Sequence, residues 1–359
     1  MSAIAVLHRD PMPGPVREGG RARRAGLLAA LSDAEVHHLA VSCRGSDTLE
    51  GRLYPYFRAL AQGLAVAGHS SAPRLLVFYP ELPGAHPARA WKLPLVFAWL
   101  ALLRWICTAR GIRLLVDFGD VPRWQHRALH LPLPMRSGLH RLLELVLCAL
   151  ADRVTVATPE LADRLARDLG LPRARFAVLP NAARPAPRRA PRPPGRARFI
   201  YVGSLDARQD RGIRALCESF VTRAPRRAEL VLVGEGGEWI AQAYPSPRLR
   251  VLPPQPEDVC ARWVARSDFA LIPYPTHGYY HTVSPIKLPL YALARTPIIS
   301  TPLEATKRVI AQHALGECLD MGEAFANLRD LEWKYRAFRG GRNLQAFRWT
   351  VSARILLEA

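Results

Sequence analysis

Short apolar runs alternate with segments of helical periodicity along most of this chain. In the first half, apolar runs occupy residues 3–7, 36–41, 75–79, 112–118, 153–157 and 176–179. Helical patterns lie between several of these runs, at residues 21–31, 93–108, 139–149 and from 158 onward. A continuous apolar run is typical of a strand that is buried on both faces of a parallel sheet. The first half therefore predicts a parallel sheet covered by helices.

The second half repeats this alternation. Its apolar runs occupy residues 199–202, 229–233, 249–252, 269–272 and 298–300. Its helical patterns occupy residues 212–222, 238–244 and 259–265, and another follows Ser284. Strands that alternate with helices at this spacing indicate doubly wound α/β domains, which bind ligands at the carboxyl ends of their strands. Two such domains in tandem favour a substrate site in the cleft between them.

A stretch rich in proline and arginine separates the two halves. Dense proline keeps a chain extended and like charges repel, so residues 184–198 predict an exposed linker. We therefore expect an N-terminal Rossmann-like domain over residues 1–183 and a C-terminal one over residues 199–340. Residues 341–359 predict a last helix.

Composition narrows the class of protein. A length of 359 residues with 49% hydrophobic content suffices for two domains with buried cores and excludes disorder of the whole chain. The cysteines are scattered without a CxxC pair, so we expect buried thiols in a reducing compartment, not a metal site. No signal peptide is recognisable, and the longest apolar run, residues 93–103, is shorter than the roughly 20 residues that span a bilayer. We expect a cytoplasmic protein, either soluble or peripheral on the inner face of the cell membrane.

The formal net charge is +20, carried almost entirely by arginine. The basic residues do not form a stripe interleaved with aromatic residues, so nucleic acid is not an expected partner. An anionic membrane surface or an anionic substrate fits the charge, and so does a coding bias towards arginine, alanine and proline. The apolar helix over residues 93–107 carries Trp99 and Trp105, and it is either a lipid-docking helix or a buried core element.

The segment Ser284-Pro285-Ile286-Lys287 carries the clearest chemistry. It predicts a loop that opens a helix, and such a loop directs free backbone N–H groups and the positive end of the helix dipole to one point. A hydroxyl and an ammonium beside that point suit a phosphate or diphosphate. An ordinary capped helix that binds no ligand would have the same pattern.

Several segments, in this order and spacing, resemble GT-B glycosyltransferases of the family-4-like kind, the glycosyl transferases group 1. ADRVTVATPELADRL…FAVLPNAA (151–183) is similar to the end of their N-terminal domain. FIYVGSLDARQDRG (199–212) and LVLVGEG (230–236) are similar to the first strands and turns of their nucleotide-binding domain. SPIKLPLYALARTPIIST (284–301) resembles their donor-site segment, and WTVSARILLEA resembles their last helix, which often returns to the first domain.

This resemblance implies a set of donor-binding residues. Lys287 would hold the diphosphate with Ser284, Arg211 would neutralise phosphate charge, and Gly203 with Ser204 would let the diphosphate approach the backbone. Fixed cations can stabilise a leaving nucleoside diphosphate without a metal, so we expect neither a metal nor a cofactor. The full expected donor set is Gly19, Gly20, Gly203, Ser204, Arg211, Gly234, Tyr280, Ser284, Pro285, Ile286, Lys287 and Glu304.

Three positions depart from the family pattern. Leu290 stands where the family has a glutamate for the ribose hydroxyls, and Arg295 stands where it has a glycine. Glu304 or Glu235 could supply the missing carboxylate. Gly119 stands where an acceptor-side histidine is usual.

On the acceptor side, Asp120 is the candidate catalytic residue. An inverting transfer needs a carboxylate that removes the proton of the acceptor hydroxyl, whereas a retaining transfer does not. Asp120 could instead be a helix N-cap or accept a structural hydrogen bond, and Asp117 is expected to be structural.

The expected function is transfer of a sugar from a UDP- or GDP-linked donor to a carbohydrate or lipid-linked acceptor, in cell-surface polysaccharide or glycolipid assembly. A non-catalytic GT-B protein that binds a glycan or a partner enzyme remains the alternative, because Leu290 and Gly119 replace polar residues. A protein that binds nucleic acid by charge alone is a third reading.

Overall fold

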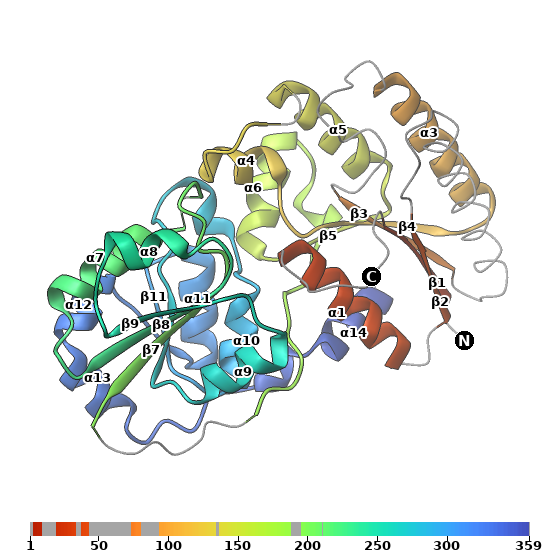
Figure 1. The fold of residues 1–359 in the computed structure, drawn as a ribbon. Helices are drawn as coiled ribbons and strands as arrows, with labels where there is room; N and C mark the ends of the chain where they lie inside the picture. The colour runs from red at the N-terminus through yellow and green to blue at the C-terminus, as the bar shows by residue number, and fades with distance from the viewer. Residues whose placement is uncertain are drawn as a thin grey trace.

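The computed structural model describes residues 3–8, 19–33, 37–42, 73–79, 93–133, 136–187, 195–209 and 211–358. Over these residues the chain forms two six-stranded sheets, one in each half, and every strand pair in them is parallel. Helices cover both sheets (Figure 1). The α/β fold class with two Rossmann-like sheets is therefore as the sequence predicts.

The N-terminal sheet has the strand order β2-β1-β3-β4-β5-β6. Its strands are β1 (Ala3–His8), β2 (His37–Ser42), β3 (Arg74–Tyr79), β4 (Arg113–Phe118), β5 (Arg153–Val156) and β6 (Phe176–Val178). Its helices are α1 (Gly19–Asp33), α3 (Leu93–Ala109), α4 (Pro122–Ala128), α5 (Ser137–Leu150) and α6 (Pro159–Leu169). Thr158 caps α6, because its Oγ1 accepts a hydrogen bond from the backbone N–H of Leu161 (3.0 Å) and Pro159 takes the first helical position.

The C-terminal sheet has the strand order β12-β11-β10-β7-β8-β9, the arrangement of a dinucleotide-binding fold. Its strands are β7 (Ala197–Val202), β8 (Ala228–Val233), β9 (Leu249–Leu252), β10 (Phe269–Ile272), β11 (Ile298–Ser300) and β12 (Gly316–Cys318). Its helices are α7 (Ile213–Arg223), α8 (Glu238–Ala243), α9 (Glu257–Ala265), α10 (Lys287–Leu293), α11 (Glu304–His313), α12 (Met321–Ala326) and α13 (Leu328–Tyr335). A short 3-10 helix, η3 (Gly278–Thr282), precedes α10.

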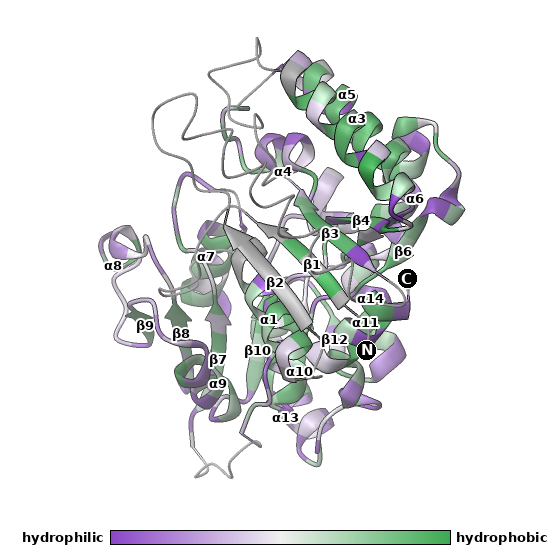
Figure 2. Ribbon diagram, turned by 90° about the vertical axis from the view of Figure 1, so that its right-hand side faces the viewer, coloured by the Kyte–Doolittle hydropathy of each residue, from purple (hydrophilic) through white to green (hydrophobic). Residues whose placement is uncertain are grey.

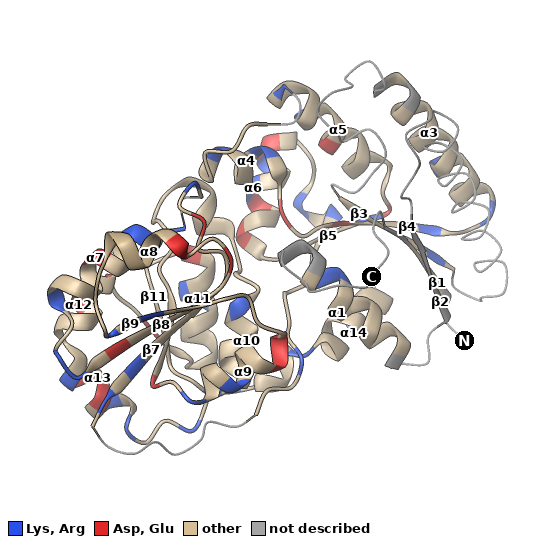
Figure 3. Ribbon diagram, in the orientation of Figure 1, with Lys and Arg blue, Asp and Glu red and all other residues tan. Residues whose placement is uncertain are grey.

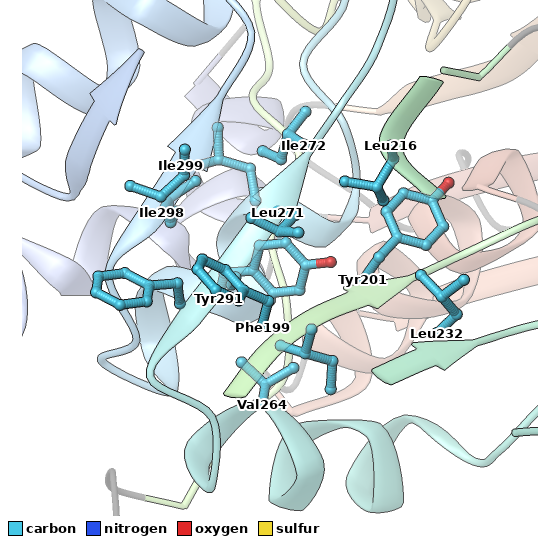
Figure 4. Close-up of a cluster of buried hydrophobic side chains, with 14 of the residues drawn as sticks. Phe199, Tyr201, Leu216, Leu232, Val264, Leu271, Ile272, Tyr291, Ile298 and Ile299 are labelled. Atoms are coloured by element: carbon cyan, nitrogen blue, oxygen red, sulfur yellow. The ribbon is translucent and has the colours of Figure 1, made fainter. Parts of the chain in front are cut away.

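The core of the C-terminal half lies between its sheet and the flanking helices. Phe199, Tyr201, Leu271 and Tyr291 point into it together with the aliphatic residues of neighbouring strands (Figure 4). The polar hydroxyl of Tyr291 has a hydrogen-bond partner within this apolar core, because it accepts a hydrogen bond from the backbone N–H of Val202 (2.9 Å). Figure 2 shows the central strands of both sheets as mainly hydrophobic, as expected for strands buried on both faces.

The last helix, α14 (Trp349–Glu358), returns to the N-terminal half and packs on α1 (Figure 1). Trp349 lies so close to Gly26 that a Cβ at residue 26 would lie 2.1 Å from the indole ring. The Ser352 hydroxyl also donates a hydrogen bond to the carbonyl of Pro180 (3.1 Å). The end of the chain thus contributes to the hydrophobic core that β1, β3 and α1 form.

Three boundaries differ from those expected from the sequence. Gly19 and Gly20 are the first residues of α1, whereas the helical pattern in the sequence begins only at residue 21. β7 begins at Ala197, inside the stretch assigned to the linker, of which residues 188–194 lie outside the described residues. Residues 344–347 form a separate 3-10 turn, so α14 is shorter than the helix predicted from residue 341. Sequence patterns locate helix ends poorly because the terminal residues lack the full set of backbone hydrogen bonds.

Candidate functional site

The candidate site lies at the carboxyl edge of the C-terminal sheet, between β7 and β10. The strand order reverses there, because the chain builds outward from β7 in one direction and from β10 in the other. Open α/β sheets bind their ligands at such a switch point. Gly203 follows β7, Tyr274 comes soon after β10, and Lys287 begins α10 beside them.

Lys287 is a buried cation for which the described residues supply no hydrogen-bond partner. Its side chain is 6% exposed, and its Nζ makes no hydrogen bond within the part of the chain that the structure describes. The Nζ lies 3.6 Å from the ring centroid of Tyr201 and 5.1 Å from that of Tyr274. Burial, and then the charge of Arg211, hold the pKa of Lys287 well below its usual value. A buried ammonium in this state gains strongly when an anion binds.

Two glycines bring the backbone close to this ammonium. A Cβ at Gly203 would lie 2.6 Å from the Lys287 Nζ, and Gly203 has a φ of 147°, which residues with a side chain rarely adopt. A Cβ at Gly234, which follows β8, would lie 1.8 Å from the carbonyl oxygen of Gly203. The two strand ends can approach each other and Lys287 only because neither residue has a side chain.

Arg211 is the second cation of the site. The next residue, Gly212, places its α-carbon against Pro273, since a Cβ there would lie 1.8 Å from the Pro273 carbonyl oxygen. Arg211 donates a hydrogen bond from Nε to Oε1 of Gln209 (2.9 Å). Burial lowers the pKa of Arg211, but the neighbouring Tyr274 and Tyr201 more than offset this and the pKa is raised overall. The guanidinium therefore keeps its charge next to Lys287.

Asp120, at the end of β4, faces this site from the N-terminal half. Its Oδ1 accepts a hydrogen bond from the Tyr279 hydroxyl of η3, and its Oδ2 accepts one from Nε2 of Gln125 (3.3 Å). Burial raises the pKa of Asp120, while the bond from Tyr279 and the charge of Arg211 partly offset that rise. Asp120 is not a helix N-cap, because α4 begins after Val121 without a side-chain cap.

Three more hydrogen bonds join the N-terminal half to the segment before Lys287. The Thr158 hydroxyl donates to the carbonyl of Thr282 (2.7 Å), and Nδ2 of Asn181 donates to the carbonyl of Ser284 (2.7 Å). Nη1 of Arg164 donates to the carbonyl of Gly278 (3.0 Å). The residues that lead into α10 are thus held by side chains from the other half of the molecule.

The structure shows the surroundings of the three positions that depart from the family pattern. Leu290 is buried and packs in the core of the C-terminal half. Arg295 has a φ of 57°, the left-handed conformation that explains why a glycine would fit that turn. A Cβ at Gly119 would lie 3.1 Å from Cδ of Arg23, so a larger side chain there would have to displace Arg23. Arg23 instead pairs with Asp117, and two hydrogen bonds of 2.8 Å join their side chains. Asp117 therefore has a structural role.

The remaining predicted residues are spread around the site. Ser204 follows Gly203, and its carbonyl accepts a hydrogen bond from the Tyr201 hydroxyl (3.2 Å). Tyr280 is buried, with its ring 5.4 Å from that of Tyr274. Pro285 is buried, and Ile286 packs against the core that contains α1 and α14.

The two expected carboxylates and the first glycines lie elsewhere. Glu304 is exposed in the first turn of α11, and Glu235 is exposed after Gly234, so neither is part of the buried group around Lys287. Gly19 and Gly20 begin α1, on the N-terminal half.

Several residues of the site were not singled out from the sequence. Tyr201, Tyr274 and Tyr279 surround the two cations and Asp120, and Asn181 and Arg23 join the two halves. The Pro-Asn pair after β6 and the arginines that open α1 were visible signals. Their partners lie more than 90 residues away, and no local pattern identifies such contacts.

Two searches of the described residues were negative. They contain no group of three His, Cys, Asp or Glu side chains placed to hold a metal ion. They also contain no helix with the length and apolar character needed to cross a membrane.

Comparisons with known proteins agree with this geometry. Residues 196–328, which include the whole Lys287 region, match the family described as Glycosyl transferases group 1. The chain is similar in structure to sucrose-phosphate synthase from Thermosynechococcus elongatus, with a TM-score of 0.71, 16% identity and coverage of 100% of this chain and 98% of that one. It is also similar to HepE of Anabaena in complex with UDP and glucose (TM-score 0.62, 11% identity, 99% and 98% coverage).

A third similar structure is the apo form of the lipopolysaccharide outer core galactosyltransferase WaaB, with a TM-score of 0.60, 10% identity and coverage of 99% and 98%. No curated protein sequence matches the chain. The fold over nearly the whole length is that of GT-B glycosyltransferases, and the family match covers the half that carries Lys287. Residues 196–328 therefore match the glycosyl transferases group 1, and the chain as a whole has the GT-B fold.

Proposed function

We propose that this protein is a glycosyltransferase that moves a sugar from a UDP- or GDP-linked donor to a hydroxyl of a carbohydrate or lipid-linked acceptor, in the assembly of a cell-surface polysaccharide or glycolipid. The observation that carries the proposal is the buried ammonium of Lys287, which has no hydrogen-bond partner among the described residues and faces the Gly203 turn. A diphosphate would supply the missing counter-charge, because burial makes an unpaired ammonium costly.

The same two cations suit the chemistry of the leaving group. As the sugar–phosphate bond breaks, negative charge develops on the departing nucleoside diphosphate. Lys287 and Arg211 are already in place and largely dehydrated, so they need no reorganisation to stabilise that charge. We therefore propose that the transfer needs no metal ion. Solved structures of HepE contain UDP or UDP-glucose, which supports UDP as the first donor base to test.

On the acceptor side we propose Asp120 as the general base of an inverting transfer. It ends β4 opposite the donor site, and a carboxylate with two hydrogen bonds retains lone pairs for an acceptor hydroxyl. Its raised pKa also favours proton uptake. If it is the base, Asp120→Asn lowers turnover by about 10² to 10⁴ and leaves donor affinity unchanged. A loss below tenfold would mean that Asp120 only holds Tyr279 and that the transfer uses no such base.

Calorimetric titration tests the donor site directly. The purified protein is titrated with UDP, GDP, CMP and dTDP, and the titration is repeated on Lys287→Ala. We expect one nucleotide to bind at micromolar strength and to bind about tenfold or more weakly in the variant, the loss of one charge-assisted contact. Lys307→Ala, which changes an exposed lysine on α11, is the control and should bind as the wild type does. A folded protein that binds no nucleotide would overturn the proposal.

For the membrane, we propose that the face formed by α3 and α5 docks on anionic lipid. α3 has one buried face and one exposed face: Trp99, Leu100 and Leu103 are buried, while Leu102 and Trp105 are exposed, Trp105 at 68%. Leu142 of the adjacent α5 is also exposed, and Figure 2 shows both helices as mainly hydrophobic. Exposed Arg110 directly follows α3, exposed Arg141 lies on α5, and Figure 3 shows basic residues in both halves of the molecule. An aromatic and aliphatic face with arginines suits an anionic lipid surface.

Vesicle co-sedimentation tests this docking. We expect binding to vesicles with anionic lipid and little binding to vesicles of phosphatidylcholine alone. Trp105→Ser should weaken the binding about tenfold, since it removes a large apolar side chain. Trp333→Ser is the matched control, because Trp333 is 80% exposed but lies on α13 in the C-terminal half. Equal binding of both variants would contradict the proposed face.

Leu290 is the reason to test the alternative that the protein binds a ligand without catalysing sugar transfer. A leucine at this buried position cannot accept the hydrogen bonds of a ribose, so donor recognition must come from other groups. Nucleotide binding without any sugar transfer or donor hydrolysis would favour a GT-B protein that binds a glycan or a partner enzyme.

A further inference from the structure

Asn181 lies between the two halves of the molecule and contacts both. Its Nδ2 donates a hydrogen bond to the carbonyl of Ser284 (2.7 Å), and its Oδ1 accepts one from Nη1 of Arg23 (2.8 Å). A guanidinium can only donate and a carbonyl can only accept, so these two partners fix which way the amide points. Arg23 therefore orients Asn181 for its bond to Ser284.

Arg23 is in turn held rigidly by the N-terminal half. Its Nε and Nη2 donate to both oxygens of Asp117 at 2.8 Å, and its Nη2 also donates to the carbonyl of Leu179 (2.7 Å). Thr155, opposite Asp117 in the β4–β5 register, donates a further bond to that carboxylate (2.6 Å). Arg23 and Asp117 are 3% and 1% exposed. The pair is a fully hydrogen-bonded, bidentate unit with little freedom to move.

The residues that Asn181 holds are those that present Lys287. Ser284 begins the 284–287 loop, and the carbonyl of Pro285 accepts a hydrogen bond from the N–H of Leu288 (2.9 Å), which closes the turn into α10. Ile286 packs on the core that contains α1 and α14. Lys287 then faces Gly203 and Tyr201, which belong to the C-terminal half as Lys287 does. Ser284 and Ile286 thus attach the loop to the N-terminal half, while the side chain of Lys287 lies among residues of the C-terminal half.

We infer that Asn181 is a positioning residue for the 284–287 loop, oriented by the Arg23–Asp117 pair, so that contact between the two halves sets the place of Lys287. The inference rests on the proposed function, because it assigns the loop to a diphosphate. Asn181 does not touch the donor in this scheme and acts only through the carbonyl of Ser284.

Asn181→Asp separates the two contacts of the side chain. The carboxylate still accepts from Arg23 but cannot donate to Ser284, and it places two acceptor oxygens against each other. Amide hydrogen exchange, measured by mass spectrometry on a peptide that covers residues 284–293, should become faster in this variant. Arg308→Gln is the matched control, because it breaks another contact between the halves, the exposed ion pair with Glu160 (2.6 Å), away from the loop. It should leave the exchange of that peptide unchanged.

A double-mutant cycle with Lys287 tests the positioning role further. The probe is inorganic pyrophosphate, which has no base or sugar and so does not depend on Leu290. Asn181→Asp alone should weaken its binding about threefold to tenfold, the effect of one hydrogen bond. Lys287→Ala should cost about tenfold in the wild-type background but threefold or less in the Asn181→Asp background, because the ammonium is then already misplaced.

The outcomes separate this inference from the proposed function. If pyrophosphate and nucleotides bind the wild type, and Asn181→Asp changes neither exchange nor affinity, the positioning role alone is wrong. If Lys287→Ala costs the same factor in both backgrounds, Asn181 merely stabilises the fold, and the inference is again overturned. If exchange rises as expected but no phosphate ligand binds the wild type, Asn181 holds the loop and the donor assignment fails.

Discussion

Two buried cations, Arg23 in the N-terminal half and Lys287 in the C-terminal half, have opposite surroundings. Arg23 donates hydrogen bonds to Asp117, to Asn181 and to the carbonyl of Leu179. Lys287 is almost as deeply buried, but its Nζ makes no hydrogen bond within the described residues; it lies against the rings of Tyr201 and Tyr274 and near the like charge of Arg211.

This difference indicates which cation serves the fold and which serves a ligand. A buried charge with complete hydrogen bonding is costly to disturb and gains nothing from an added anion. A buried charge without a partner weakens the fold and is retained only where something else compensates. We propose that binding of the donor diphosphate is that compensation, and the family match over residues 196–328 supports this proposal.

The largest expected effect is the loss of Arg23. Arg23→Ala leaves the Asp117 carboxylate buried with the Thr155 hydroxyl as its one remaining side-chain donor among the described residues, so the free energy of unfolding should fall by about 3–5 kcal/mol. Urea unfolding followed by circular dichroism measures it. Replacing both members of the pair, Arg23→Met with Asp117→Leu, should recover part of the loss. A change below 1 kcal/mol for Arg23→Ala would erase the contrast with Lys287.

Lys287→Met should act in the opposite direction. It removes an unsatisfied buried cation and loses only the contact with the tyrosine rings, so the free energy of unfolding at neutral pH should rise by about 1–2 kcal/mol. The pKa of Lys287 is lowered in the folded protein, so the unfolded chain binds more protons in the window between the two pKa values. Stability should therefore rise with pH across that window, and Lys287→Met should remove this slope. Unfolding in urea between neutral and alkaline pH measures both effects, with Lys307→Met as the control. Destabilisation like that of Arg23→Ala would contradict the assignment.

Asp120 is an intermediate case, a half-buried carboxylate that accepts two hydrogen bonds. Tyr279→Phe removes the stronger of them, and since that bond lowers the pKa of Asp120, the pKa should rise. The carboxylate form would then be lost at a higher pH, and the acidic limb of the kcat/KM profile should move to higher pH. At neutral pH the rate should fall about tenfold or less. Tyr244→Phe, on the far end of α8, should leave the profile unchanged, and an unmoved limb in Tyr279→Phe would exclude Asp120 as the titrating group.

The smallest expected effect concerns Arg295, whose backbone conformation should affect the free energy of unfolding more than its charge does. Arg295 adopts a φ of 57° in the turn after α10, at a cost of about 1–2 kcal/mol for a residue with a side chain. Arg295→Gly should raise the free energy of unfolding by about 0.5–1 kcal/mol, because glycine also loses more chain entropy on folding. Thermal unfolding measures it, and a loss of stability would mean that the side chain, which donates to the carbonyl of Arg339 (3.3 Å), matters more than the turn.

The sequence identified the parts of the site that are local. The Ser-Pro-x-Lys segment, the glycines that follow β7 and β8 and the Thr-Pro-Glu helix start are short patterns whose meaning depends on neighbouring residues. The structure places Lys287, Gly203 and Gly234 together, whereas it leaves Glu304 and Glu235 exposed outside the buried group. The sequence could not decide between those carboxylates, because their distance to Lys287 depends on how whole elements pack.

The sequence by itself determined the two parallel sheets, their approximate elements and the candidate phosphate loop, because burial periodicity and turn chemistry are properties of neighbouring residues. Only the tertiary structure decided that the Lys287 Nζ makes no hydrogen bond to any described residue, that Tyr279 binds Asp120, and that Asn181 connects Arg23 to Ser284. These contacts join residues that are far apart in the chain. They arise from the packing of one half against the other, which no local pattern of side chains encodes.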